Sequence, residues 1–214
     1  MKNRTTIWLF VMLVFILPVL GFAVMNWYTN RVQPLPLLGP VSTDISGNKT
    51  QHSISDFVMT DQDGRKVSAE TWKNKIVVVD FFFTHCPIVC PKLTNSIQTV
   101  QKNFNSDSGI LFNSFSVDPE RDSISVLKEY TKRFALDTHN WHLLTGDKKE
   151  IYKLARNSFM IVATDGDGGP EDFIHSEKLV LIDKQKKIRG YYSGTDAVEV
   201  NQLIADIKKL KNEK

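Results

Sequence analysis

The chain has 214 residues, of which 42% are hydrophobic and 24% charged, and its 27 basic and 24 acidic residues give a net charge of +3. These values are average for a folded domain, and they exclude a disordered chain and a membrane protein with many spans. The charges are mixed along the sequence and no basic run is interleaved with aromatic residues, so we expect no nucleic-acid partner. The length suits one globular domain in addition to an apolar N-terminal segment.

This N-terminal segment has the composition of a membrane span. No charged residue occurs in Thr5–Asn30, and the apolar stretch Ile7–Val24 is long enough to cross a bilayer as a helix. Lys2 and Arg4 precede the stretch, whereas only Arg31 follows it directly. The positive-inside rule therefore predicts a cytoplasmic N-terminus and a domain on the other side of the membrane.

A cleaved signal peptide is the alternative interpretation of the same segment. Gly21–Ala23 would be a small-x-small cleavage site, but the apolar stretch is longer than that of a usual signal peptide. The domain is exported in either case. Because the segment lacks the Arg-rich and Ser-rich character of a mitochondrial presequence, we expect a single-pass protein of a bacterial inner membrane with its domain in the periplasm.

Three parts are therefore expected along the chain. Residues 1–28 form the cytoplasmic N-terminus and the transmembrane anchor, and residues 29–51, which are rich in Pro and Gly, form an extended linker. Residues 52–214 form the folded domain.

The folded domain is expected to open with a hairpin, in which residues 52–60 and 65–68 flank a turn at 61–64. The next segment, Ile76–Phe83, is a run of Val, Ile and Phe broken only by Asp80. Such a run predicts a strand that is buried on both faces. This strand leads directly to the two cysteines of the chain.

A helix is expected directly after Cys90, with Pro91 at its first position and apolar residues at helical spacing behind it. The later elements follow from periodicity, caps and turn residues. They are a strand at 110–117, a helix at 123–134 capped by Asp122 or Ser123, a helix at 148–158, a short strand at 159–163, a loop at 164–172, a strand at 173–182, a turn at 183–186, a strand at 188–193 and a helix at 196–211. This order predicts an α/β domain with a mixed sheet flanked by helices, as in a thioredoxin-like fold.

Cys86 and Cys90 are spaced C-x-x-x-C where the buried strand gives way to the helix. Thiols at a helix N-terminus meet unpaired N–H groups and the positive end of the helix dipole, which lowers the thiol pKa and favours the thiolate. Thiolates exchange with disulfides or bind a soft metal such as Cu(I). A structural disulfide is a further alternative, but closing so short a loop contributes little chain entropy.

The spacing of the two thiols helps to separate these uses. Redox thioredoxins use C-x-x-C, whereas the additional residue here leaves the two sulfurs one helical turn apart on one face, with room for a metal between them. Structural zinc needs four ligands, and the chain has only two cysteines. Copper accepts two thiolates and one imidazole, because soft sulfur suits Cu(I) and nitrogen helps to hold Cu(II).

Four segments that occur in order carry a resemblance to a known family. They are Phe82–Pro91 (FFTHCPIVCP), Val117–Ser123 (VDPERDS), Trp141–Gly146 (WHLLTG), and Phe173–Ser176 followed by Leu179–Asp183 (FIHS and LVLID). With these segments the chain, from about Ile54 to its C-terminus, resembles the Sco/SenC copper proteins of cytochrome c oxidase assembly. The resemblance implies a thioredoxin-like domain outside the cytoplasm, a membrane anchor, and copper, as Cu(I) or Cu(II), bound by Cys86, Cys90 and His175.

Two positions depart from the pattern of the family. Ile88 and Ile174 stand where family members commonly carry Asp, beside the cysteine motif and before the distal histidine. The lost carboxylates are expected to alter copper affinity, thiol pKa or docking to the target, while the three ligands remain.

The other candidate side chains have weaker support. His85 could tune the neighbouring thiolate or bind copper transiently, but adjacent residues of an extended segment point to opposite faces, so an indirect or solvent-exposed role is favoured. Asp118 and Arg121–Ser123 follow a predicted strand, and helix capping is favoured over contact with copper or a partner. Three further histidines have no motif support and are expected to be structural or exposed: His52, His139 and His142.

The expected function is that of a monomeric metallochaperone, not an enzyme, that hands copper to the copper-bearing subunit of cytochrome c oxidase. The main alternative is a thiol-disulfide oxidoreductase with Cys86 as nucleophile and Cys90 as resolving thiol, which would not need His175. A peroxidase is less favoured, since Thr84 lies one residue too close to Cys86. A redox or copper sensor would use the same residues as the metallochaperone.

Overall fold

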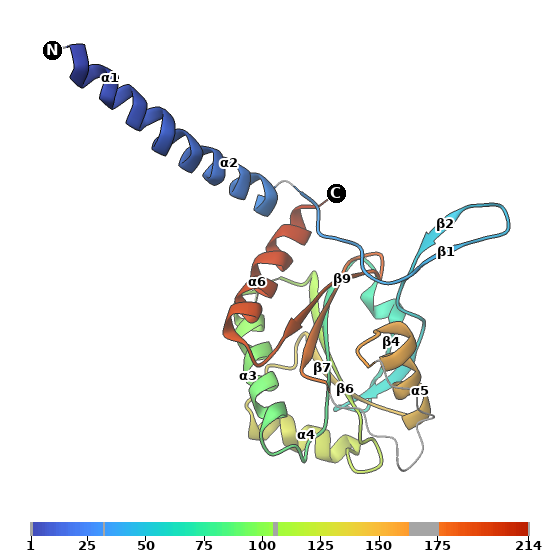
Figure 1. The fold of residues 1–214 in the computed structure, drawn as a ribbon. Helices are drawn as coiled ribbons and strands as arrows, with labels where there is room; N and C mark the ends of the chain where they lie inside the picture. Colours follow the sequence, from blue (N-terminus) through green and yellow to red (C-terminus); the bar gives the residue numbers. More distant parts are fainter. Residues whose placement is uncertain (1, 32, 105–106, 163–175, 214) are drawn as a thin grey trace. The chain divides into compact units, whose positions relative to one another are not determined.

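The computed structural model describes residues 2–31, 33–104, 107–162 and 176–213 (Figure 1). The chain divides into two compact units, one that ends at Pro34 and one that runs from Leu35 to Asn212.

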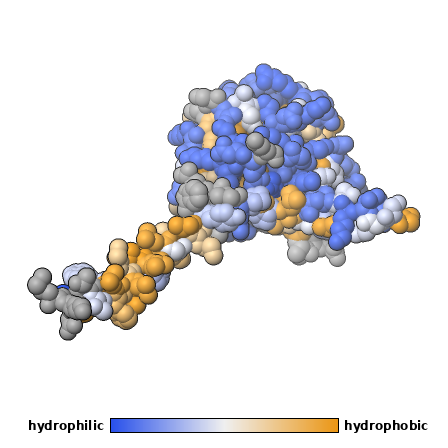
Figure 2. Space-filling model, turned by 90° about the horizontal axis from the view of Figure 1, so that it is seen from above, coloured by the Kyte–Doolittle hydropathy of each residue, from blue (hydrophilic) through white to orange (hydrophobic). Residues whose placement is uncertain are grey.

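The N-terminal unit is helical. It consists of α1 (Lys2–Val11), a π-helical turn η1 (Met12–Ile16) and α2 (Leu17–Arg31). The π-helical turn lies just before Pro18, whose missing N–H removes one ordinary helical hydrogen bond. The 21 residues from Thr6 to Asn26 are long and apolar enough to cross a membrane. Figure 2 shows the apolar side chains gathered along this helix, whereas the visible face of the globular unit is mostly hydrophilic.

The globular unit is built on a seven-stranded mixed sheet with the strand order β4-β3-β7-β6-β5-β8-β9. β5 is parallel to β6 and β6 to β7, and the other neighbours are antiparallel. The strands are β3 (Val58–Asp61), β4 (Lys66–Ser68), β5 (Ile76–Phe82), β6 (Ile110–Ser116), β7 (Trp141–Thr145), β8 (Lys178–Ile182) and β9 (Ile188–Ser193). The predicted hairpin is β3–β4, although its first strand begins at Val58 and not at residue 52. Its turn is held by Asp61 Oδ1, which accepts hydrogen bonds from the amides of Asp63 and Arg65.

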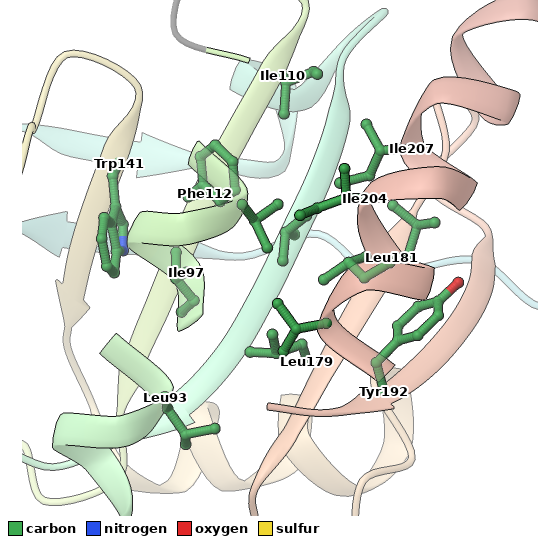
Figure 3. Close-up of a cluster of buried hydrophobic side chains, with 14 of the residues drawn as sticks. Leu93, Ile97, Ile110, Phe112, Trp141, Leu179, Leu181, Tyr192, Ile204 and Ile207 are labelled. Carbon is green, nitrogen blue, oxygen red and sulfur yellow. The ribbon is translucent and has the colours of Figure 1, made fainter. Parts of the chain in front are cut away.

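Helices cover both faces of this sheet. They are η2 (Ala69–Trp72), α3 (Val89–Lys102), α4 (Ile124–Arg133), α5 (Lys148–Lys153) with the π-helical turn η3 (Leu154–Ser158), and α6 (Ala197–Asn212). Every residue of β5 is buried, as predicted, because its side chains alternate between two cores. Val78 belongs to the core that includes Ile97 of α3 and Ile204 of α6, whereas Val79 belongs to the core on the opposite face with Trp72 and Phe159. Figure 3 shows how Ile97 and Ile204 lie in the first of these cores. The prediction of a thioredoxin-like mixed sheet flanked by helices is confirmed.

The structure differs from the predicted elements in three further places. β7 was not predicted as a strand. The strand predicted at 159–163 is absent from its described part, 159–162, where Met160 has a φ of 50° that no regular strand contains. The strand predicted from residue 173 begins at Lys178 in the described residues, and its first three residues, together with the predicted loop 164–172, lie outside them.

The expected linker is partly folded. Leu35 is buried with 9% of its surface exposed, and the amide of Leu38 donates to the carbonyl of Ile188 in β9 at 2.9 Å. A second hairpin follows, β1 (Val41–Thr43) with β2 (Lys49–Gln51), which pairs with no strand of the main sheet. The globular unit therefore begins within the segment 29–51, at Leu35.

Candidate functional site

The two cysteines lie where β5 ends and α3 begins. Both thiols are free and buried, with 6% of Cys86 and 3% of Cys90 exposed, and both belong to the core between the sheet and α3. α3 starts at Val89, two residues before the expected position, so Cys90 lies in its first turn and Pro91 at its third position. The amide of Cys90 donates to Sγ of Cys86 at 3.3 Å. The open N–H groups of a helix start therefore point at the first thiol.

The two thiols differ in pKa because their surroundings differ. Burial raises the pKa of Cys86, but hydrogen bonds from the amides of Cys90, Ile88 and Val89 outweigh it, and the net effect is a lowered pKa. Burial also raises the pKa of Cys90, and the nearby charges of Cys86 and Asp80 raise it further. Cys86 is thus the more readily ionised thiol, and Cys90 stays protonated until the environment of the pair changes.

A polar cluster lies beneath the thiols on β5 and β6. Burial raises the pKa of Asp80 to about 7, against the effect of the Ser114 hydroxyl, and Asp80 Oδ1 has no hydrogen-bond partner among the described residues. Ser114 also accepts a hydrogen bond from Trp141 Nε1 at 2.9 Å. Burial likewise raises the pKa of Tyr130, whose hydroxyl lies 2.9 Å from the Thr94 hydroxyl. The residue that interrupts the apolar run of β5 is therefore a protonatable acid near the site.

A second buried acid, Asp122, lies beside the segment that precedes Cys86. Its carboxylate accepts hydrogen bonds from the amide and the hydroxyl of Thr84 at 3.1 and 2.5 Å, and from the Ser116 hydroxyl at 2.6 Å. The structure shows no side-chain cap at the start of α4, where Ser123 occupies the N-cap position. Ser123 is thus the N-cap residue, as one of the two expected residues, but the cap has no side-chain hydrogen bond. The expectation that Asp122 caps the helix is wrong, because its carboxylate binds Thr84 and Ser116 instead. No pattern in the sequence indicates that Asp122 binds Thr84 and Ser116.

His85 lies at the surface of the same segment, as its expected solvent-exposed role requires. Its side chain is 55% exposed, and its Nδ1 lies 3.1 Å from the Thr84 hydroxyl and 3.7 Å from Asp122 Oδ1. With Thr84 it lines an open groove of about 350 Å³, whose remaining wall is formed by α4 through Val126, Glu129, Tyr130 and Arg133. This groove is the cavity that adjoins the cysteine segment.

The third predicted ligand, His175, lies outside the described residues, as does Ile174. Ile88 is 63% exposed at the start of α3, where the family's acid would meet solvent. Within the described part of the chain, no three His, Cys, Asp or Glu side chains form a group that could hold a metal ion. Two buried thiols, one of them with a lowered pKa, form a soft and incomplete donor set among the described residues, which suits Cu(I).

The other predicted residues lie in ordinary structural contacts. Asp118, whose side chain is 20% exposed, pairs at 3.8 Å with Arg121, whose side chain lies mostly in solvent. The three further histidines each contact a nearby oxygen: His52 Nε2 the Ser158 carbonyl at 2.8 Å, His139 Nδ1 the Asp137 carboxylate at 2.7 Å, and His142 Nδ1 the Asp61 carboxylate at 3.2 Å. None of these contacts joins the cysteine site.

Comparison with known proteins gives the same family throughout. The family model SCO1/SenC matches residues 46–212. The SCO1 protein homolog of Bacillus subtilis (strain 168) is 31% identical over 159 residues, which cover 73% of this chain and 82% of that protein.

Two solved structures extend the comparison. The chain matches BsSco, described as a Sco-family cytochrome c oxidase assembly protein with a disulfide switch, at 28% identity with a TM-score of 0.68, covering 85% of this chain and all of that one (100%). It matches Bradyrhizobium japonicum ScoI with copper bound at 27% identity with a TM-score of 0.60, covering 74% of this chain and 99% of that one. The paired thiols at the start of α3, the thioredoxin-like sheet and these matches show that the chain belongs to the SCO1/SenC family, the Sco family of cytochrome c oxidase assembly proteins.

Proposed function

We propose that the protein is a membrane-anchored metallochaperone that delivers copper to the copper-bearing subunit of cytochrome c oxidase. The observation that carries this proposal is the pair of free, buried thiols at the start of α3, of which Cys86 has a lowered pKa. Soft thiolates in a nearly dry site bind Cu(I) and exclude harder divalent ions. The match to a copper-bound relative supports the same cargo.

In this proposal Cys86, Cys90 and His175 are the copper ligands, and no turnover chemistry occurs. Cys86 supplies the first thiolate, because the amides at the start of α3 stabilise it. Cys90 loses its proton only when the metal binds, since metal ligands must be deprotonated. Release then proceeds by ligand exchange, in which the thiolates of the target replace those of the protein one after the other.

The proposed location is a bacterial inner membrane, with one span and the globular unit in the periplasm. The apolar helix from Thr6 to Asn26 supports the anchor, and the charges of Lys2 and Arg4 support its orientation. An exported site must then be kept reduced for loading, because thiol pairs outside the cytoplasm tend to oxidise.

An anaerobic Cu(I) titration of the reduced globular unit, from Leu35 to the C-terminus, against a competing chelator tests the proposal. We expect one tightly bound copper, and an affinity at least tenfold lower, about 1.4 kcal/mol, in Cys86→Ser, Cys90→Ser and His175→Ala. His139→Ala is the matched control, because His139 is a surface residue paired with Asp137. Weak binding that none of the three substitutions changes would refute the ligand set.

A thiol-disulfide oxidoreductase is the second candidate, and the difference between the two thiols favours it. A nucleophile with lowered pKa followed by a more buried thiol with raised pKa is the arrangement that disulfide exchange needs. Exchange requires no imidazole. Two results for His175→Ala would together favour the reductase. The variant would reduce a disulfide substrate at the wild-type rate, and it would bind copper no more weakly than the wild type does, so that His175 is needed for neither.

A further inference from the structure

Asp122 is a buried carboxylate that joins three segments of the site. Thr84 follows β5, Ser116 ends β6, and Asp122 lies just before α4. The Asp122 carboxylate is 0% exposed and accepts three hydrogen bonds, two from Thr84 and one from Ser116. Because an ionised buried carboxylate is stable only when donors satisfy it, one side chain holds the three segments together.

The hydrogens available in this cluster determine the tautomer of His85. The Thr84 hydroxyl has a single hydrogen, and Asp122 takes it, because an ionised carboxylate can only accept. The contact of 3.1 Å between the Thr84 hydroxyl and His85 Nδ1 must then use a hydrogen on Nδ1. A neutral imidazole has one N–H, so Nε2 carries no hydrogen and is an acceptor.

We propose that Asp122 and Thr84 are positioning residues, which order the segment before Cys86 and hold His85 as the Nδ1–H tautomer with Nε2 as a hydrogen-bond acceptor. Asp122 Oδ1 lies 3.7 Å from His85 Nδ1, too far for a hydrogen bond of its own, so the Thr84 hydroxyl is the group that holds this N–H. His85, which directly precedes Cys86, lines the groove of about 350 Å³ against α4, and its ring is 55% exposed, so a segment bound there could reach its acceptor nitrogen. An amide N–H or a thiol of a protein segment that approaches Cys86 is the kind of donor this acceptor would take. The inference rests on the proposed function only in taking Cys86 as the reacting thiol.

Two substitutions at Thr84 test the tautomer. Thr84→Val removes the hydroxyl at nearly constant volume, whereas Thr84→Ser keeps it. We expect long-range ¹H–¹⁵N correlation spectra of the reduced, copper-free full chain in detergent, recorded where imidazole is neutral, to show the Nδ1–H form of His85 in the wild type and in Thr84→Ser. In Thr84→Val the Nε2–H form, which predominates in free histidine, becomes the major one. An Nε2–H majority in the wild type, or equal spectra for both variants, would overturn the proposal.

Hydrogen exchange tests the anchoring role of Asp122 separately. Asp122→Asn leaves a single acceptor oxygen for three donors, so exchange of the residue 84 amide is expected to accelerate at least tenfold. In Thr84→Val this amide keeps its bond to Asp122 and its protection. Asp118→Asn is the matched control, since this nearby carboxylate contacts Arg121 and is partly exposed. Unchanged protection in Asp122→Asn would refute the anchoring role, and because neither measurement involves copper, both remain readable if the metallochaperone function fails.

Discussion

Asp80 is a carboxylic acid buried in the middle of β5, and its protonation is linked to stability. Its pKa in the folded protein is about 7, because burial disfavours the charged form, against 3.8 in the unfolded chain. Between these values the folded protein binds the additional proton, so the free energy of unfolding falls as the pH rises through this window and is lowest above pH 7. The loss can amount to about 4 kcal/mol.

The corresponding prediction concerns Asp80→Asn, which cannot ionise. Relative to this variant, the wild type should lose stability steadily from pH 4 to pH 8 in urea denaturation of the reduced protein. Asp63→Asn is a control of opposite sign, because a hydrogen bond from the Lys128 ammonium lowers the pKa of Asp63. Parallel pH profiles for the wild type and Asp80→Asn would show that Asp80 does not change its charge in this window.

The sequence predicts the site residues whose side chain alone indicates the function, such as a thiol. It does not predict the residues whose role depends on tertiary hydrogen-bond partners. Cys86 and Cys90 were placed at the start of a helix by the strand before them and the proline after them, and the structure agrees. Asp122 has an ordinary helix-cap sequence, and only the tertiary approach of Thr84 gives it another role. His175 stays a prediction.

At the scale of elements, the segment before the first long strand is part of the fold. The Arg189 guanidinium donates to the carbonyls of Leu35 and Pro36 at 2.7 and 3.1 Å and pairs with Asp183 at 3.0 Å in a buried site. A chain that begins at Gln51 loses both carbonyls and the buried Leu35 side chain. Since unsatisfied buried donors and lost apolar burial both cost free energy, this chain should be less stable than one that begins at Leu35 by about 2–4 kcal/mol.

Urea denaturation of the two truncated proteins measures this difference. Ile45→Ser in the longer protein is the control, because Ile45 is fully exposed in the loop between β1 and β2 and should not alter stability. Equal stability of the two truncated proteins would mean that the segment from Leu35 contributes nothing to the globular unit.

Two wrong predictions, at β7 and at residues 159–163, have the same cause. In short segments, a run of apolar residues can reflect burial alone, and it does not distinguish a strand from other buried structure. β7 contains Leu143 and Leu144 side by side, both buried, so it shows no alternation. Phe159 is apolar because it packs against Trp72 and Phe81, not because it belongs to a strand. Longer segments such as β5 and α3 were predicted correctly, because their patterns continue over several turns or residues.

At the scale of the whole molecule, the proposed topology makes a direct prediction. Externally added protease should digest the globular unit in spheroplasts and leave it intact in inside-out vesicles, because in the proposed topology Lys2 and Arg4 keep the N-terminus in the cytoplasm. The intact mass of the membrane-extracted protein should include the apolar helix. A shorter protein cut after Ala23 would instead establish the signal-peptide alternative.

The two thiols belong to the same apolar core that holds α3 to the sheet. Cargo binding and folding are consequently one linked equilibrium, since a ligand that binds only the folded form adds RT ln(1 + [L]/Kd), about 2.7 kcal/mol at a hundredfold excess over Kd. Under the proposed function, the empty carrier is therefore also the less stable one, and each transfer of copper to the target lowers the free energy of unfolding of the protein that delivered it.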